Sequence, residues 1–223
     1  LIVAYNTAPE ERMSTLNEVS EMLQKGKAQE VKDLVQKALD EGIAAKDILE
    51  DGLMPGMAII GDKFKKNEVY VPEVLIAARA MNAGIDILRP MLSDTDTGGR
   101  GTVVIGTVKG DLHDIGKNLV KIMMEGKGMN VVDLGIDVSP ENFVNAAKEN
   151  NANIIACSAL LTTTMTEMEN VVKAAEEAGI RDTITIMVGG APVTENFKDS
   201  IGADIYAPDA ASAADEAIAA CAS

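Results

Sequence analysis

The chain has 223 residues, of which 47% are hydrophobic and 25% are charged, and its formal net charge is −15. This composition is typical of a globular protein, and the chain is long enough for one or two domains with their own cores. Residues 1–100 sum to −5 and residues 101–223 to −10, so neither half has the basic surface that duplex binding requires. We therefore expect no nucleic-acid partner.

Cysteine spacing and the length of the apolar runs indicate the compartment. Cys157 and Cys221 form no C-x-x-C pair, whereas an oxidising compartment more usually shows closely spaced pairs, so a cytoplasmic location is favoured. No run reaches about 18 apolar residues, and we expect no membrane association. Residues 1–13 show no clear pattern and are expected to form a disordered or non-native leader.

The first half of the chain has helical periodicity. Apolar residues recur three or four positions apart, as at Val31, Val35 and Ala38. Glycine and proline break this pattern and delimit helices at residues 14–25, 28–41, 46–65 and 72–92. We predict a four-helix bundle, a domain of residues 14–94. Turn-forming residues then predict a linker at 95–101.

The second half, residues 102–223, alternates short β-branched runs with helical stretches. The predicted strands are residues 102–107, 130–134, 153–158, 183–188 and 204–206. Strands that are apolar throughout are expected when helices cover both faces of a sheet. We therefore predict an α/β fold, a doubly wound five-stranded parallel sheet of flavodoxin or Rossmann-like type. Its ligand crevice lies at the carboxyl ends of the first and third strands.

The loop after the first strand contains the chain's single histidine, His113, two residues after Asp111. A carboxylate that accepts the Nδ1 proton leaves Nε2 free to bind a metal. A zinc site needs three or four protein ligands, which this loop does not offer. A single protein ligand implies a cofactor that supplies the others, as tetrapyrrole-type rings do. The alternative is a histidine that is hydrogen-bonded for packing.

The loops after the third and fourth strands reach the same edge of the sheet. Residues 158–164 are rich in hydroxyl groups where a helix is expected to begin, and any of these side chains could be an ordinary N-cap. Gly189 and Gly190 allow a ligand or a backbone segment to approach closely, or form a plain tight turn.

Together the three loops carry a known pattern: D-x-H-x-x-G, then S-x-L, then G-G. The matching residues are Asp111, His113, Gly116, Ser158, Leu160, Gly189 and Gly190. On these residues the sequence resembles the cobalamin-binding domain shared by methionine synthase and the corrinoid proteins of methyltransferase systems. Residues 52–57 (GLMPGM) and 69–74 (VYVPEV) resemble the helical cap domain that precedes it.

The resemblance implies cobalamin or a related corrinoid as the cofactor, in a methylcobamide form that cycles between Co(I) and Co(III). His113 replaces the lower base on cobalt, Asp111 accepts its proton, and Thr164 extends this relay. Ser158 bonds near the displaced base, Leu160 lines its slot, and the two glycines leave room for it. The residues expected to contact the cofactor are Asp111, Leu112, His113, Asp114, Ile115, Gly116, Ser158, Leu160, Thr162, Gly189 and Gly190.

The upper face of the corrinoid needs an apolar cover, because Co(I) oxidises easily. By their place in the cap motif, Tyr70, Val71, Val74 and Ala77 are the candidates, and the alternative for each is ordinary bundle core.

The resemblance implies a methyl carrier that is not catalytic alone. A substrate:corrinoid methyltransferase loads it, and an acceptor methyltransferase of the tetrahydrofolate or thiol type unloads it. A reductive activation protein is the third expected partner. Alternatives are a cobalamin-dependent sensor or regulatory module, a mutase small subunit, and a receiver or flavodoxin domain that leaves the histidine unexplained. The methyl donor stays open among methylamines, methanol, quaternary amines, thiols and aryl methyl ethers.

Overall fold

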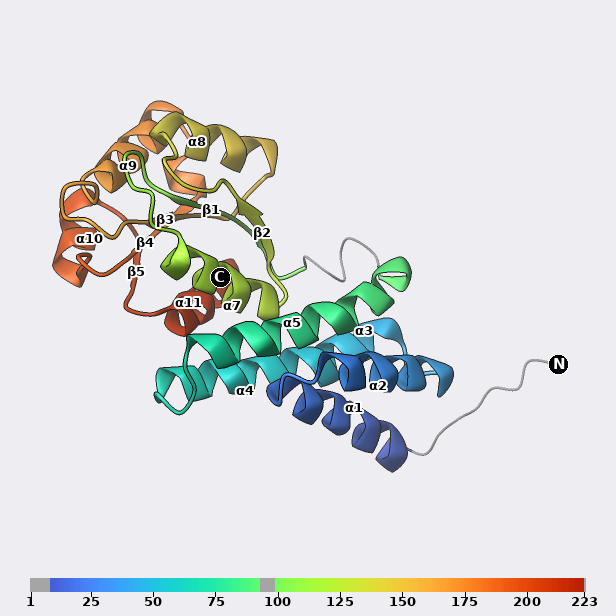
Figure 1. Cartoon of the computed structure of the whole chain (residues 1–223). Coiled ribbons are helices and arrows are strands. Elements are labelled where there is room, and N and C mark those ends of the chain that lie inside the picture. The colour runs from blue at the N-terminus through green and yellow to red at the C-terminus, as the bar shows by residue number, and fades with distance from the viewer. Residues whose placement is uncertain (1–8, 93–98, 223) are drawn as a thin grey trace. The chain divides into compact units, whose positions relative to one another are not determined.

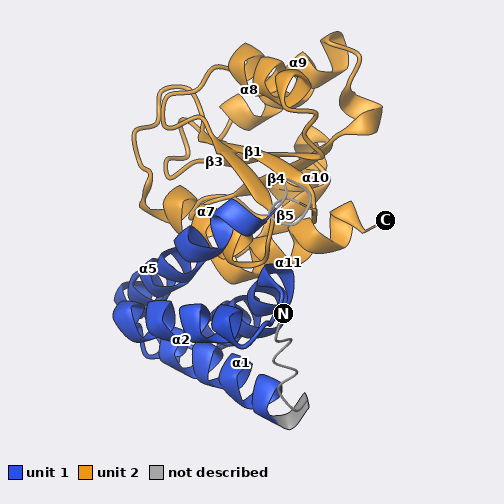
Figure 2. Ribbon diagram, turned by 90° about the vertical axis from the view of Figure 1, so that its right-hand side faces the viewer, with its two compact units in different colours: residues 1–97 blue, residues 98–223 orange. Residues whose placement is uncertain are grey.

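The computed structural model describes residues 9–92 and 99–222. The chain divides into two compact units, residues 1–97 and 98–223, which Figure 2 distinguishes by colour. Residues 1–8 of the expected leader and residues 95–98 of the expected linker lie outside the described residues.

Unit 1 is helical, as the apolar periodicity predicts. Its elements are α1 (Pro9–Gln24), α2 (Ala28–Asp40), α3 (Ala45–Asp47), the π-helical turn η1 (Ile48–Leu53), α4 (Met54–Lys65), α5 (Val71–Leu88) and the 3₁₀ turn η2 (Arg89–Met91). The residues that set the pattern in α2, Val31, Val35 and Ala38, are completely buried. Burial of one apolar face therefore stabilises the bundle.

Unit 1 departs from the prediction most clearly at three places, and its other helix ends lie within one residue of the predicted ones. Helix α1 begins at Pro9 rather than Ser14, and proline suits a first helical position because its missing N–H has no partner there. The helix expected over 46–65 contains η1, where the Met54 N–H bonds to the Leu49 carbonyl five residues back, directly before Pro55. Helix α5 ends at Leu88 because Pro90 cannot continue the hydrogen-bond ladder.

Unit 2 is a doubly wound α/β domain. Its strands are β1 (Thr102–Thr107), β2 (Asn130–Asp133), β3 (Ile154–Ser158), β4 (Thr185–Gly189) and β5 (Ile205–Ala207). All pairings are parallel and the order is β2-β1-β3-β4-β5, which confirms the predicted flavodoxin-like sheet. The helices are α7 (Ile115–Gly126), α8 (Pro140–Glu149), α9 (Glu167–Glu177), α10 (Glu195–Ile201) and α11 (Ala210–Cys221), with a 3₁₀ turn η3 (Arg181–Thr183) before β4.

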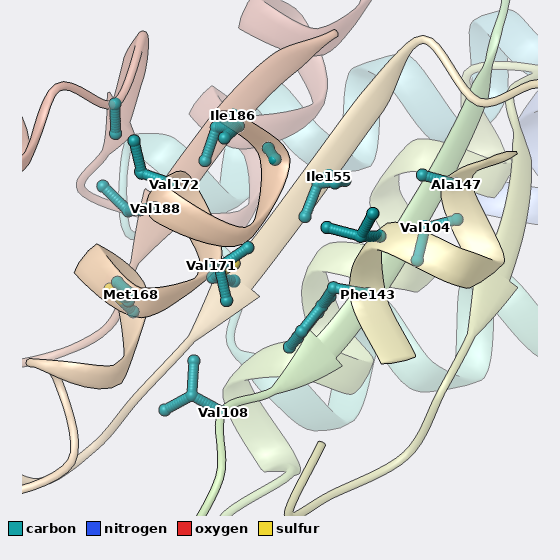
Figure 3. Close-up of a cluster of buried hydrophobic side chains, with 14 of the residues drawn as sticks. Val104, Val108, Phe143, Ala147, Ile155, Met168, Val171, Val172, Ile186 and Val188 are labelled. Atoms are coloured by element: carbon teal, nitrogen blue, oxygen red, sulfur yellow. The ribbon is translucent and has the colours of Figure 1, made fainter. Parts of the chain in front are cut away.

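Helices cover both faces of this sheet, with α7 and α11 packed together on one face and α8 and α9 on the other (Figure 1). On the face covered by α8 and α9, the strand residues Val104, Ile155 and Ile186 form one apolar cluster with Phe143 and Val171 from these helices (Figure 3). Double coverage explains why β1, β3 and β4 are apolar along most of their length.

The strand register brings the predicted loops to one level. Thr107, the last residue of β1, pairs with Ser158, the last of β3, and Ser158 pairs with Gly189, the last of β4. The loops that follow these three strands therefore start side by side at the carboxyl edge of the sheet.

Candidate functional site

The β1–α7 loop holds a coupled carboxylate and imidazole. Asp111 is fully buried, whereas the His113 side chain is 51% exposed. Asp111 Oδ1 lies 2.7 Å from His113 Nδ1 and also accepts the backbone N–H of His113 at 3.1 Å. An ionised carboxylate only accepts, so Nδ1 carries the proton and the lone pair lies on Nε2. Nε2 is thus the nitrogen that can bind a metal.

The second oxygen of Asp111 ties this loop to the β3–α9 loop. Oδ2 accepts the Thr164 hydroxyl at 2.7 Å and the backbone N–H groups of Leu160 and Leu161 at 2.9 and 3.3 Å. Burial by itself raises the pKa of Asp111, but the hydrogen bonds from Thr164, from the backbone and from the imidazole outweigh it, and this pKa lies well below its ordinary value. The carboxylate is therefore ionised whenever the protein is folded near neutral pH.

Thr164 shows why the hydroxyl-rich segment is not a helix cap. Helix α9 begins only at Glu167, and its N-cap, Thr166, makes no side-chain capping bond. The residues between β3 and α9 form turns, and within them Thr164 is buried against Asp111. Thr162 is exposed and Ser158 is partly buried. Of these hydroxyls, Thr164 is the one joined to the carboxylate.

Gly189 and Gly190 have a steric reason to be glycine. A Cβ on Gly190 would lie 1.9 Å from the Ala159 carbonyl oxygen, and its φ of +131° also disfavours any side chain. A Cβ on Gly189 would lie 3.2 Å from the Ala207 carbonyl oxygen. Gly190 therefore lets the loops after β3 and β4 touch, whereas Gly189 lies against the end of β5. Gly116 differs, because a Cβ there would meet no atom within 4 Å.

Large apolar side chains are exposed at the carboxyl edge of the sheet, where His113 also lies. They come from the β1–α7 loop, the first residue of α7 and the loops after β2 and β3, and are Leu112 (66% exposed), Ile115 (76%), Ile136 (42%), Leu160 (45%) and Leu161 (42%). We call these five residues the apolar rim. Exposed apolar side chains gathered at one place mark a binding surface. An imidazole within such a rim fits a flat, largely apolar ring with a metal at its centre.

The described residues hold no group of three or more His, Cys, Asp or Glu side chains that could bind a metal by themselves. A metal at His113 must therefore bring other ligands with it, as corrinoid cobalt does.

Two supporting residues carry no signal in the sequence. Thr107 is fully buried, and its hydroxyl donates to the His113 carbonyl at 2.9 Å, which fixes the far end of the loop. Lys117 is 2% exposed, and its ammonium donates to Asp133 at 2.6 Å and to Asn118 at 2.7 Å, joining the first turn of α7 to the end of β2. Thr107 is an ordinary residue type for a strand and Lys117 for a helix, so the sequence gives no reason to single them out. Their hydrogen-bond partners become visible only in the folded structure.

The candidate cap residues separate into two kinds. Val74 and Ala77 are completely buried within unit 1, as bundle-core residues are. Tyr70 is 64% exposed and Val71 is partly buried, at the start of α5. Exposure leaves Tyr70 and Val71 as the candidates for contact with a ligand.

Comparison with known proteins shows the family of this chain. Residues 101–218 match the B12 binding domain family, and residues 15–89 match a second family with the same description. Trimethylamine corrinoid protein 1 of Methanosarcina acetivorans is 44% identical over 180 residues, 80% of this chain and 83% of that protein. Dimethylamine corrinoid protein 1 of Methanosarcina mazei is 43% identical over 199 residues, 89% of this chain and 92% of that protein.

Among solved structures, a chain of the methanol:cobalamin methyltransferase complex MtaBC from Methanosarcina barkeri has a TM-score of 0.85 and 30% identity, covering 97% of this chain and 86% of that chain. Fold and site together thus define a B12-binding protein. More particularly, the chain belongs to the family of corrinoid proteins that combine a helical and a Rossmann-like B12 binding domain. Within residues 9–92 and 99–222, no helix has the length and apolar character needed to cross a bilayer.

Proposed function

We propose that His113, oriented by Asp111, would hold the cobalt of the cofactor in this corrinoid protein, which carries a methyl group between methyltransferases. The observation that carries the proposal is the 2.7 Å contact between Asp111 and His113 Nδ1, which leaves the lone pair of a half-exposed imidazole on Nε2. The bound corrinoid supplies a cobalt centre that can accept and release a methyl group.

The chain's own residues orient the ligand and manage its proton. Asp111 and Thr164 form a relay that ends at a buried, ionised carboxylate. Because Asp111 accepts the proton of Nδ1, Nε2 of the neutral ring would be free to hold the metal, and Nδ1 would continue to donate to Asp111.

The residues around this pair suit a corrin face and a nucleotide tail. We assign the ring contacts to the loop that contains His113, where the exposed side chains of Leu112 and Ile115 support them. Gly116 leaves open space beside this loop. The assigned cofactor-contacting residues are Leu112, Asp114, Ile115, Gly116, Ser158, Leu160, Thr162, Gly189 and Gly190, with Tyr70 and Val71 from unit 1.

The protein acts with a methyltransferase partner. The names of its relatives favour a methylated amine as the donor that this partner demethylates, and they give no support to the sensor alternative. We further propose an acceptor methyltransferase of the tetrahydrofolate or thiol type, and a reductive activation protein. Cys157 and Cys221 are free, which favours the reducing cytoplasm as the place of action.

Reconstitution with a corrinoid tests the function. The purified chain should bind one corrinoid, and the loaded protein should accept a methyl group from a trimethylamine-, dimethylamine- or methanol-specific methyltransferase. His113→Gly should keep the fold and lose imidazole coordination. Binding of no corrinoid, or transfer that is unchanged in His113→Gly, would contradict the proposal.

A further inference from the structure

Asp137, in the loop between β2 and α8, contacts the His113 loop through both its side chain and its backbone. Its Oδ1 accepts the backbone N–H of Gly110 at 2.7 Å, and its own N–H donates to the Asp111 carbonyl at 3.1 Å. The residue is exposed and has a φ of +53°, in the left-handed region. A residue other than glycine in this region is uncommon, and Asp and Asn are the types that tolerate it best.

The two hydrogen bonds of Asp137 restrain the Gly110–Asp111 dipeptide at both of its ends. One holds the N–H of Gly110 and the other holds the carbonyl of Asp111, so these two residues have little conformational freedom. This restraint matters because Gly110 itself has a φ of +79° and, as a glycine, constrains the backbone weakly. The loop after β2 therefore adds a restraint to the site loop at Gly110 and Asp111.

The position of Asp111 has to be accurate because its carboxylate serves several donors at once. Thr164 and His113 Nδ1 each lie 2.7 Å away, and the Leu160 N–H lies 2.9 Å away. Hydrogen bonds weaken steeply as their angles depart from linearity, so a small rotation of the Asp111 backbone would weaken these bonds together.

We infer that Asp137 is a positioning residue of the corrinoid site: by holding Gly110 and Asp111, it keeps the Asp111 carboxylate aligned with His113 and so keeps the lone pair on Nε2. The inference rests on the proposed role of His113 as the cobalt ligand. The hydrogen bonds of Asp137 go to Gly110 and Asp111, so it acts on the imidazole through Asp111.

Three variants separate the carboxylate from the unusual backbone conformation. Asp137→Ala removes the acceptor and keeps the strain, whereas Asp137→Gly removes the acceptor and relieves the strain. Asp137→Asn keeps an acceptor oxygen and tolerates the left-handed conformation. The matched control is Asn151→Ala, which changes another residue with positive φ, 48°, in the turn before β3 at the opposite edge of the sheet.

Two readouts use the corrinoid-free protein. Hydrogen exchange of the Gly110 amide reports the bond to Asp137, and the ¹⁵N shifts of the His113 ring report which nitrogen carries the proton. Asp137→Ala and Asp137→Gly should speed exchange and lower the ratio of Nδ1–H to Nε2–H tautomer by about three- to tenfold, the effect of one lost hydrogen bond. Asp137→Asn and Asn151→Ala should match the native protein in both measurements, with circular dichroism confirming the fold of each variant.

A third readout uses the loaded protein, where the ratio of imidazole-bound to unbound Co(II), followed by EPR, should fall in the same two variants and recover in Asp137→Asn. Native values for Asp137→Gly in the exchange and tautomer measurements would overturn the inference. A protein that binds no corrinoid would defeat the proposed function alone, because the corrinoid-free readouts still decide the role of Asp137.

Discussion

Replacing Asp111 with asparagine should reverse the tautomer of His113. The side-chain position that faces the Leu160 and Leu161 N–H groups and the Thr164 hydroxyl demands an acceptor, so the amide oxygen of the new side chain will occupy it. The amide NH₂ then faces His113, and it can donate only if Nδ1 becomes an acceptor. The ring proton moves to Nε2, where it blocks the lone pair that binds metal.

The magnitude follows from the bonds that change. Asp111 makes three hydrogen bonds of 2.7 to 2.9 Å, and charged bonds are roughly twice as strong as neutral ones. In the variant, the NH₂ group also faces the backbone N–H of His113, which in the native protein donates to Asp111 Oδ1. Two donors then face each other, and this hydrogen bond is lost. We expect a loss of about 2–4 kcal/mol of folding free energy. Affinity of the imidazole for cobalt should fall about 10- to 100-fold.

Nitrogen NMR of ¹⁵N-histidine-labelled protein, at a pH where the ring is neutral, measures the tautomer directly. The native protein should show Nδ1–H, and Asp111→Asn should show Nε2–H. Asp114→Asn is the matched control, because Asp114 lies in the same loop and its carboxylate accepts from Asn118 instead. An Nδ1–H ring in Asp111→Asn, with undiminished imidazole coordination, would refute the reasoning.

Three further predictions concern stability. Chemical unfolding should show that Asp133→Ala costs about 3–5 kcal/mol, since it leaves the buried ammonium of Lys117 without a carboxylate partner, and that Lys117→Met costs less. Equal costs would contradict this. Gly190→Ala should destabilise the fold far more than Gly179→Ala, because Gly179 also has a positive φ but an added Cβ there would meet no atom within 4 Å. Similar melting temperatures of the two variants would argue against the clash at Gly190. The pKa of Asp111 is lowered in the folded state, so the stability that this carboxylate contributes should be complete above about pH 4 and disappear as the pH falls further. In unfolding measurements, the difference in stability between the native protein and Asp111→Asn should therefore narrow below about pH 4. A difference that does not depend on pH would contradict the assigned charge.

The fold follows from the sequence to a large extent because its elements are set by local patterns. The apolar runs locate all five strands, and β1 has the bounds predicted for it, residues 102–107. The ends of the other strands differ from the prediction by at most two residues, where the last hydrogen bonds depend on the neighbouring strand. The π turn η1 was missed because apolar spacing does not show which carbonyl each N–H reaches.

The site is predictable where one residue type has one suitable role. A lone histidine with a carboxylate two residues earlier indicates the Asp111–His113 pair, which the structure places in contact. Thr107, Lys117 and Asp137 were missed because their partners come from other segments of the chain. Val74 is the converse case: its motif position suggested ligand contact, whereas its burial in the bundle fits the alternative given for it, ordinary core.

The ligand of cobalt is open to one direct measurement, because His113 is the only histidine in the chain. The protein should be loaded with cobalamin, reduced to Co(II), and compared by EPR with a sample grown on ¹⁵N-histidine. The ¹⁵N label should change each three-line nitrogen splitting into two lines, since ¹⁴N has spin 1 and ¹⁵N has spin 1/2. A three-line splitting that persists in the labelled protein would show that the corrinoid's own base remains on cobalt, and it would contradict the assignment of His113.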